Sequence, residues 1–472
     1  MKVNLDHVTD SKASWVFLAV TCCVMSLTGG TLESFSVLVV VFKEHFGSTN
    51  AKIGWMGAVV YSLVNFSYPI AVFIRRRYGF RVITITSGLL VTLSYIVTPF
   101  MPSIDYLFLT YCVGLGFGVG FIDCTTVVIL PEFFDKYIGL ATGFRLAGVA
   151  ATSMTFNFLV PILVDKMGWR NVLFCFSSVG LLLILYAFFY LKKPRINADK
   201  AVKASTEQEN KAVIPVFEHT SYNTKLGFIR NGGFQLIVLG CIPYLFAVGV
   251  PTMFMVAYAK SLGYPLSQSK GLIVARGAGS LCARFVMGYI GDIATRRGQI
   301  EHIACLIVGF FGIACGLCSI TKYLPLMIMF MAFAGILEGM FWVVIPLLMY
   351  ELTGGVNADY AISLMTVLIG ICMFAGPSSM GQVYDITGDF RVVLYILCSC
   401  GFLSAFITAT GVYVRLKSVR MIEILGKSKD NDSLRQCNVR CLGSPDEKLG
   451  KEIKLHTKFH EITIIAEYET AV

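Results

Sequence analysis

The sequence is poor in charge. Asp, Glu, Lys and Arg make up 14% of its 472 residues, while 56% are hydrophobic; soluble globular domains carry about 25% charged residues. A soluble protein cannot cover its surface with so few charges, and a disordered chain would not carry so many apolar side chains. The composition therefore excludes soluble enzymes, secreted disulfide scaffolds and nucleic-acid binders, and it predicts a polytopic membrane protein.

Histidine is also scarce, with six residues in the whole chain. The sequence has no His-rich cluster and no Gly-x-Ser-x-Gly turn of the kind that carries a nucleophilic serine. Most of the fifteen cysteines, such as Cys315 and Cys318, lie in apolar runs, where they act as small hydrophobic side chains. We therefore expect neither a metal, nor a cofactor, nor a catalytic centre, and no nucleic-acid partner.

Long apolar runs are abundant. A membrane-spanning helix needs about 20 apolar residues, and such runs cover residues 15–41, 53–74, 82–101, 106–130, 138–164, 171–191, 234–258, 269–290, 302–321, 324–349, 360–381 and 392–414. They must be helices, because they are far too long for the strands of a membrane barrel. The predicted fold class is an all-α polytopic membrane protein with twelve transmembrane helices.

Polar stretches divide these runs into two sets of six. A short N-terminus (1–14) precedes the first half (15–191), a linker (192–233) joins it to the second half (234–415), and a tail (416–472) follows. Lys and Arg are enriched in the linker, at the start of the tail and in the turn after the second span. The positive-inside rule then predicts that both termini are cytoplasmic, and the plasma membrane is the default location.

A 6+6 layout with a central linker resembles the major facilitator superfamily, in which the halves are inverted repeats and the binding site lies at the midplane between them. The eighth span ends in Gly288-x3-Asp292-x3-Arg296-Arg297-Gly298, which resembles a turn common in that superfamily. The resemblance implies a coupling or gating role for Asp292 and Arg296. The matching turn of the first half has Arg76 where the acid would be.

A narrower resemblance is to the monocarboxylate transporter family. The turn into the fifth span, Phe133-Phe-Asp-Lys136-Tyr-Ile-Gly-Leu140-Ala-Thr-Gly143, follows a signature of that family. Alignment of neighbouring motifs places Ser36 and Ser280 where lactate carriers have the Lys and Asp tied to proton coupling. The resemblance thus implies substrate-site positions without those two groups.

The tenth span adds a second feature of this resemblance. Gly335-Ile-Leu-Glu338-Gly339 resembles the Gly-x-x-Asp-Gly motif found in the branch of the family that carries thyroid hormone and aromatic amino acids. In that branch the acid of the motif pairs with the Arg of the eighth span. Here a Glu replaces the Asp. The resemblance therefore implies a pair between Glu338 and Arg284.

We single out five ionisable side chains of the predicted spans: Glu33, Asp123, Arg276, Arg284 and Glu338. A charge at mid-span costs about 2.5–3.5 kcal/mol, so each is a candidate functional residue. Arg284 is the first candidate for substrate contact, because its planar guanidinium can hold a carboxylate through two parallel hydrogen bonds. We expect the substrate to compete with Glu338 for Arg284; the alternative is a fixed ion pair that only joins two helices.

The remaining charges each have two interpretations. Arg276 either attracts anions in the outer vestibule or pairs with a neighbouring helix. Asp123 either accepts protons or pairs with Arg145 at the start of the fifth span, and we favour the pair. Glu33 lies near the predicted outer end of the first span, where it either reaches the membrane interface or lines the vestibule.

We therefore predict a transporter that moves a small carboxylate-bearing solute by alternating access, without proton coupling. A proton-coupled symporter that uses Asp123 or Glu338 is the alternative, and a membrane receptor or scaffold on the same fold is a third. The final Thr470-Ala-Val472 resembles a ligand of PDZ domains, or matches by chance. The sequence is silent on a single-span accessory subunit of the kind that some relatives use.

Overall fold

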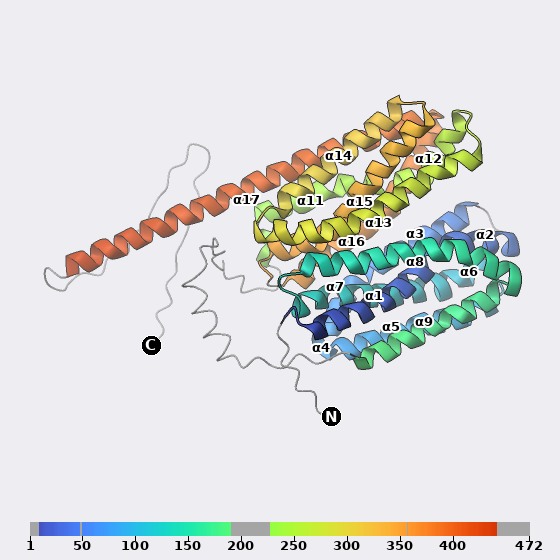
Figure 1. Cartoon of the computed structure of the whole chain (residues 1–472), viewed down its shortest axis with the longest axis horizontal. Helices are drawn as coiled ribbons and strands as arrows, with labels where there is room; N and C mark the ends of the chain where they lie inside the picture. Colours follow the sequence, from blue (N-terminus) through green and yellow to red (C-terminus); the bar gives the residue numbers. More distant parts are fainter. Residues whose placement is uncertain (1–8, 48–49, 190–226, 356, 441–472) are drawn as a thin grey trace. The chain divides into compact units, whose positions relative to one another are not determined.

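The computed structural model describes residues 9–47, 50–189, 227–355 and 357–440 (Figure 1). Contacts divide the chain into one unit of Met1–Arg415 and another of Leu416–Val472. The first unit contains the bundle of spans. The second is described as far as residue 440, where it is helical throughout. The predicted PDZ ligand, Thr470 and Val472, lies outside the described residues.

The described part of the chain is entirely helical. In the first half the helices are α1 (Lys12–Glu33), α2 (Phe35–Phe46), α3 (Asn50–Phe66), α4 (Tyr68–Tyr78), α5 (Phe80–Val97), α6 (Ile104–Leu107), α7 (Gly114–Phe133), α8 (Ile138–Met167) and α9 (Trp169–Phe189). In the second half they are α11 (Gly232–Val248), α12 (Val250–Ser261), α13 (Leu266–Arg296), α14 (Ile300–Ile320), α15 (Leu324–Leu352), α16 (Ala358–Thr387) and α17 (Phe390–Arg440). Short helical turns add η1 (Thr98–Phe100), η2 (Phe108–Val113) and η3 (Gly227–Arg230).

Twelve helical segments among these residues are long and apolar enough to cross a membrane, which confirms the predicted number. Their ends agree with the prediction to within six residues. The seventh, eighth and eleventh spans differ most, and α16, for example, continues to Thr387 rather than ending near residue 381. Polar side chains such as Asp385 end the hydropathy signal early. The helix itself ends only at Gly388, whose positive φ of 67° provides the left-handed cap.

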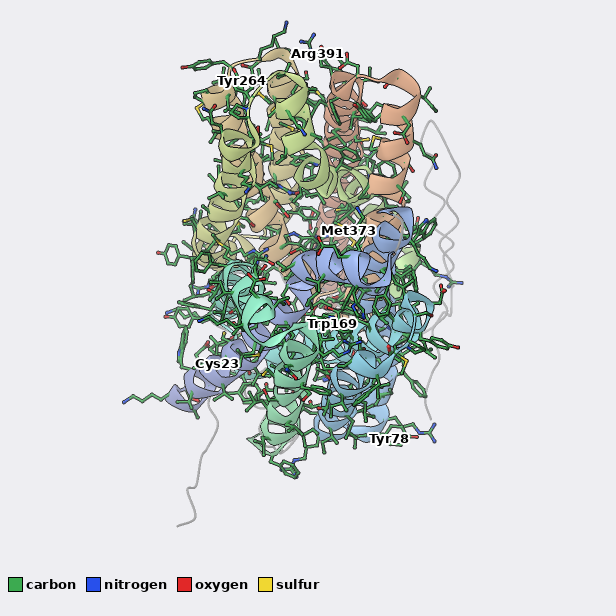
Figure 2. All side chains as sticks on the ribbon, turned by 90° about the vertical axis from the view of Figure 1, so that its right-hand side faces the viewer. Cys23, Tyr78, Trp169, Tyr264, Met373 and Arg391 are labelled. Atoms are coloured by element: carbon green, nitrogen blue, oxygen red, sulfur yellow. The ribbon has the colours of Figure 1, made fainter. Side chains whose placement is uncertain are left out.

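Three spans are broken into two helices near their middle. The first breaks at Ser34, the second at Ser67 and the seventh at Gly249. At the first two breaks a serine hydroxyl donates to a carbonyl three residues earlier, and Pro251 lies in the first turn of the helix that follows the third. A Cβ added to Gly249 would lie 3.5 Å from the Sδ atom of Met373 on α16, which is labelled in Figure 2. Breaks at this depth leave backbone carbonyls that must find donors inside the protein.

Glycines let the helices of the first half approach closely. A Cβ added to Gly116 would lie 2.6 Å from Leu63 on α3, and one added to Gly118 would lie 2.8 Å from Val91 on α5. A Cβ on Gly120 would lie 2.3 Å from the carbonyl oxygen of Val64. This run is therefore a helix-packing surface of α7, as small residues often are in membranes.

The two halves meet chiefly along two helix pairs. α8 packs against α13, and α3 packs against α16. Figure 1 shows α8 and α13 running side by side. The closest approach is again at glycines, because Gly139 and Gly143 on α8 lie against Gly288 and the backbone of Arg284 on α13. Of the joining helices, α13 carries Arg276 and Arg284 and α8 carries Arg145, whereas Glu33, Asp123 and Glu338 lie on other helices.

Candidate functional site

The acid on α15 pairs with a different arginine from the one predicted. Glu338 lies 2.8 Å from Nη2 of Arg276, and no described acid lies within salt-bridge distance of Arg284. The predicted Glu338–Arg284 pair is therefore wrong in this conformation. Of the two interpretations of Arg276, pairing with a neighbouring helix is the one that the structure shows.

The break in the seventh span explains why Arg276 lies there. Its Nη2 also donates to the carbonyl oxygen of Val248, at 2.6 Å, one residue before the break at Gly249. The guanidinium thus donates a hydrogen bond to a carbonyl that lacks an N–H partner where the helix is broken, and Glu338 neutralises the charge of the guanidinium. Arg276 is only 5% exposed, so in this conformation it joins α11, α13 and α15; a part in binding or attracting anions stays a prediction.

Arg284 crosses from one half to the other. Its Nη1 donates to the carbonyl oxygen of Leu146 on α8, at 2.7 Å, and its Nε is buried without a hydrogen-bond partner among the described residues. Glu33 on α1 and Glu338 on α15 are the acids within electrostatic range of it. The guanidinium therefore remains available to a further acceptor, such as a carboxylate.

Asp123 and Arg145 form the predicted pair. Nη1 of Arg145 lies 2.6 Å from Oδ1 of Asp123, and the hydroxyl of Tyr68 donates to the other carboxylate oxygen, also at 2.6 Å. Arg145 is 3% exposed, which makes this pair part of the interior of the first half. The pair confirms the favoured interpretation of Asp123, whereas the coupling or gating role of both residues stays a prediction.

Glu33 is the last residue before the break in the first span. The helix resumes as α2 after Ser34 and runs on to Phe46, and the two interpretations of Glu33, at the membrane interface or in the vestibule, stay predictions. Its carboxylate accepts a hydrogen bond of 3.2 Å from the hydroxyl of Tyr61 on α3. It lies within electrostatic range of both Arg284 and Glu338.

The two serines aligned with the proton-coupling positions have different surroundings. Ser36 is exposed, and its hydroxyl donates to Oδ1 of Asn157 on α8, at 2.9 Å. Ser280 is 7% exposed, and its backbone lies against α15, where a Cβ on Gly339 would come within 2.3 Å of its carbonyl oxygen. Ser36 is therefore accessible to a solute, whereas Ser280 belongs to the packing of α13 on α15.

Polar contacts also join the halves at one end of the spans. We call this end the terminal face, because the first span begins there. Both carboxylate oxygens of Asp292 accept from the backbone N–H groups of Gly139 and Leu140, in the first turn of α8, where the helix dipole favours an anion. Arg296 donates to the carbonyl oxygen of Lys136, at 2.6 Å. The geometry suits the predicted gating role of Asp292 and Arg296, which itself stays a prediction.

Sequence reasoning missed the corresponding contact of the other half. Arg76 on α4 donates two hydrogen bonds of 2.6 Å to Asp359 at the start of α16, and its guanidinium lies 4.2 Å from the ring centroid of Tyr360. The sign of the charge is reversed here: the arginine is in the turn and the acid at the helix start. The sequence showed Arg76 at the position where an acid was expected, and this could have indicated the contact. Its partner Asp359 lies 283 residues further along the chain.

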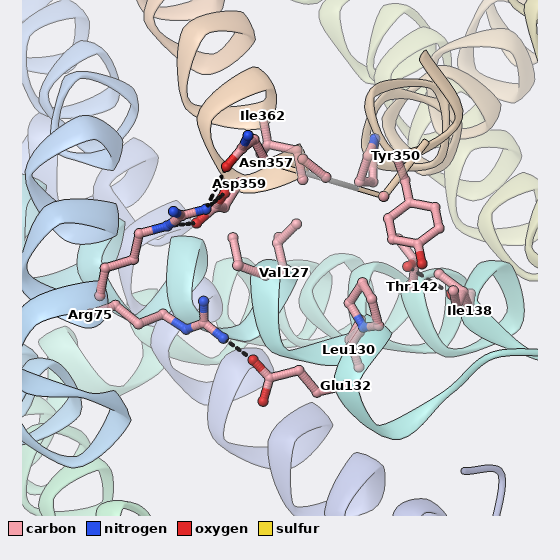
Figure 3. Close-up of a pocket in the computed structure, with 16 residues that line it drawn as sticks. Arg75, Val127, Leu130, Glu132, Ile138, Thr142, Tyr350, Asn357, Asp359 and Ile362 are labelled. Carbon is pink, nitrogen blue, oxygen red and sulfur yellow. Dashed lines mark hydrogen bonds and ion pairs between the residues drawn. The ribbon is translucent and has the colours of Figure 1, made fainter. Parts of the chain in front are cut away.

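A cavity of about 320 Å³ lies beside these terminal-face contacts (Figure 3). Both halves line it, with Val127, Glu132 and Thr142 from the first and Tyr350 and Asp359 from the second. Figure 3 shows the pair of Arg75 with Glu132 and the two hydrogen bonds from Arg76 to Asp359 at its edge. None of the predicted substrate-binding residues lines this cavity, so the cavity is separate from those residues.

Comparison with known proteins agrees with this architecture. The family model described as "Major Facilitator Superfamily" matches residues 16–321, more than half of the chain. The chain belongs to this superfamily. Within it, the chain is similar to monocarboxylate transporter 2 of Rattus norvegicus, with 23% identity over 88% of this chain and 86% of the relative. It is also similar to monocarboxylate transporter 4 of Gallus gallus, with 24% identity over 83% and 81%.

Solved structures of the superfamily share the fold. The transporter FucP in its outward conformation matches with a TM-score of 0.63 and 13% identity, over 85% of this chain and 99% of that one. The relatives confirm the resemblance to monocarboxylate transporters that the motifs indicated. Membership of the Major Facilitator Superfamily makes this chain a multi-pass membrane transporter rather than an enzyme.

Proposed function

We propose that the protein carries a small solute with a carboxylate group across the membrane by alternating access, and that Arg284 binds the carboxylate. The observation that carries this proposal is the state of Arg284 in the described part of the chain: it lies where the halves meet, with a backbone carbonyl as acceptor and no acid within salt-bridge distance. An unpaired guanidinium in a membrane interior is unfavourable. A carboxylate that binds it offsets this cost and gains charge-assisted hydrogen bonds.

We propose that transport does not depend on a proton gradient. Ser36 and Ser280 lack titratable groups. The two acids considered as alternative proton carriers each face an arginine, because Asp123 pairs with Arg145 and Glu338 pairs with Arg276. Each acid therefore already has a structural role, which is to neutralise a buried arginine.

Alternating access requires that the contacts at the terminal face break and re-form. The Asp292 and Arg76 contacts close that face in this conformation, while the solute would enter from the other side. We propose that the terminal face is cytoplasmic in the plasma membrane, in line with the basic side chains at that end.

The test is uptake of labelled carboxylate solutes by cells that express the wild-type protein or Arg284→Lys, at about pH 6 and pH 7.5. Lysine keeps the charge but loses the two-pronged geometry, so we expect a loss of uptake of roughly tenfold or more. The matched control is Arg77→Lys, at an exposed arginine of the terminal face, which should leave uptake unchanged. Normal transport by Arg284→Lys would refute the carboxylate site, and strong stimulation by acid would refute proton independence.

A further inference from the structure

The cavity at the terminal face plays no part in the proposed function, because none of the predicted substrate-binding residues lines it. Its volume of about 320 Å³ nevertheless falls in the range of small-molecule sites, which begins near about 300 Å³. Its walls come from α4, α7 and α8 of the first half and from α15 and α16 of the second. A molecule that fills the cavity therefore contacts both halves at once.

The charged side chains around the cavity cancel in pairs. Arg75 pairs with Glu132. Arg76 pairs with Asp359, and Figure 3 shows both pairs at the edge of the cavity. Among the described residues that line it, these four are the only charged ones, so the walls carry no net charge. A charged ligand would lose its hydration without gaining an opposite charge, which is costly. The cavity therefore favours an uncharged ligand.

Polar groups that lack partners indicate what this ligand should carry. Nε of Arg75 is buried and has no hydrogen-bond partner among the described residues, so an acceptor on the ligand would satisfy it. Pro131 on α7 has no N–H to donate to the carbonyl of Val127, four residues earlier in the helix. Val127 and Pro131 both line the cavity. An amide group offers both complements, a carbonyl oxygen for Arg75 and N–H groups for the carbonyl of Val127.

Apolar side chains form most of the remaining wall. Leu130 and Ile138 contribute from the first half, and Pro346 and Ile362 from the second. Pro346 lies within α15, the fourth span of its half, as Pro131 lies within α7, the fourth span of the other. An apolar group between these walls is removed from water on both sides, which is favourable.

We infer that the cavity binds an uncharged molecule whose amide group contacts Arg75 and the carbonyl of Val127 and whose apolar body lies between the halves. The contacts of Arg76 and Asp292 hold the two walls together in this conformation. The ligand therefore binds the closed terminal face more tightly than the open one, and this difference shifts the equilibrium toward the closed face. Such a molecule inhibits transport without occupying the solute site, whatever solute the protein carries.

The experiment compares compounds that share one carbon skeleton. 4-Phenylbutanamide is uncharged, 4-phenylbutanoate is an anion and 4-phenylbutylammonium is a cation. Each is applied at the terminal face of membrane vesicles, and the labelling of Thr142→Cys, within the cavity, by a membrane-impermeant maleimide is measured. We expect the amide to slow labelling at least about threefold, at a concentration roughly tenfold lower than either charged compound requires. The amide should also lower the maximal rate of uptake, and excess solute should not restore it.

Substitutions locate the effect. Arg75→Lys keeps the charge beside Glu132 but loses the guanidinium Nε, so protection by the amide should require a roughly tenfold higher concentration. Ala358→Leu places a larger side chain in the cavity wall and should abolish the protection. The matched control is Arg77→Lys, at an exposed arginine that does not line the cavity, which should keep it. Arg284→Lys, which alters the proposed solute site, should also keep it.

Each outcome has a definite meaning. If the amide does not slow labelling, or if a charged compound acts at a lower concentration in both the wild-type protein and Arg284→Lys, the inference is refuted while the proposed function stands. Protection that survives both Arg75→Lys and Ala358→Leu places the amide elsewhere and refutes it too. Inhibition that excess solute overcomes and Arg284→Lys removes assigns the amide to the solute site, which again overturns the inference. Should Arg75→Lys not reach the membrane, Ala358→Leu decides the question by itself.

Discussion

Substitution of one glycine should open the terminal face. Gly143 of α8 lies so close to α13 that an added Cβ would come within 2.5 Å of the carbonyl oxygen of Arg284 and 3.1 Å of the Cα of Gly288. These atoms belong to backbone, which cannot rotate away as a flexible side chain can. Gly143→Ala therefore requires the two halves to move apart.

The energetic cost falls on one conformation only. Overpacking by one methyl group typically costs about 1–3 kcal/mol, and here the methyl meets the other half only when the terminal face is closed. A penalty of this size changes the equilibrium between closed and open terminal faces by about 5- to 150-fold. The control is Gly277→Ala on α13, where an added Cβ meets nothing within 4 Å; alanine there should favour the helix by about 0.5–1 kcal/mol without affecting the equilibrium.

The assay is the accessibility of a cysteine placed in the cavity beside this contact. Thr142 lines that cavity and is 3% exposed, so Thr142→Cys should react slowly with a membrane-impermeant maleimide applied at the terminal face. Adding Gly143→Ala should raise the labelling rate at least about fivefold and slow uptake. Equal labelling rates with Gly143→Ala and Gly277→Ala would refute the reasoning.

Three further predictions concern two ion pairs and the contact of Asp292 with the start of α8. Arg76→Asp and Asp359→Arg should each favour the open terminal face by about 1 kcal/mol, measured as faster labelling in the same assay, and the double exchange should restore the wild-type rate; no restoration would contradict a direct pair. Asp123→Ala leaves Arg145 buried and unpaired and should lower stability by about 3–5 kcal/mol. Thermal unfolding in detergent measures this loss, the double variant with Arg145→Leu should recover most of it, and an unchanged melting temperature in the single variant would argue against the pair. Asp292→Asn keeps one acceptor but loses the charge at the first turn of α8, so labelling should increase by less than with Asp292→Ala; the reverse order would contradict the helix-dipole argument.

Much of the fold was predictable because span length is a local property. Each run of about 20 apolar residues identifies a helix without reference to its neighbours, and all twelve were found this way. The pair of Asp123 with Arg145 was also predictable, since both residues lie on consecutive spans of one half. The continuation of α16 past its apolar run was not, because a glycine cap rather than hydropathy ends that helix.

The partners of the remaining charges depended on tertiary structure. Arg276 and Arg284 lie on one helix, about 12 Å apart along its axis and about 80° apart around it, so either could face α15. The rotation of α13 and the broken backbone at Gly249 decide that Arg276 meets Glu338. By itself, the sequence determined how many helices span the membrane and which carry charge, because apolar length and residue type are local. Only the packing of helices far apart in the chain decided which charges form ion pairs across the bundle, as Glu338 does with Arg276.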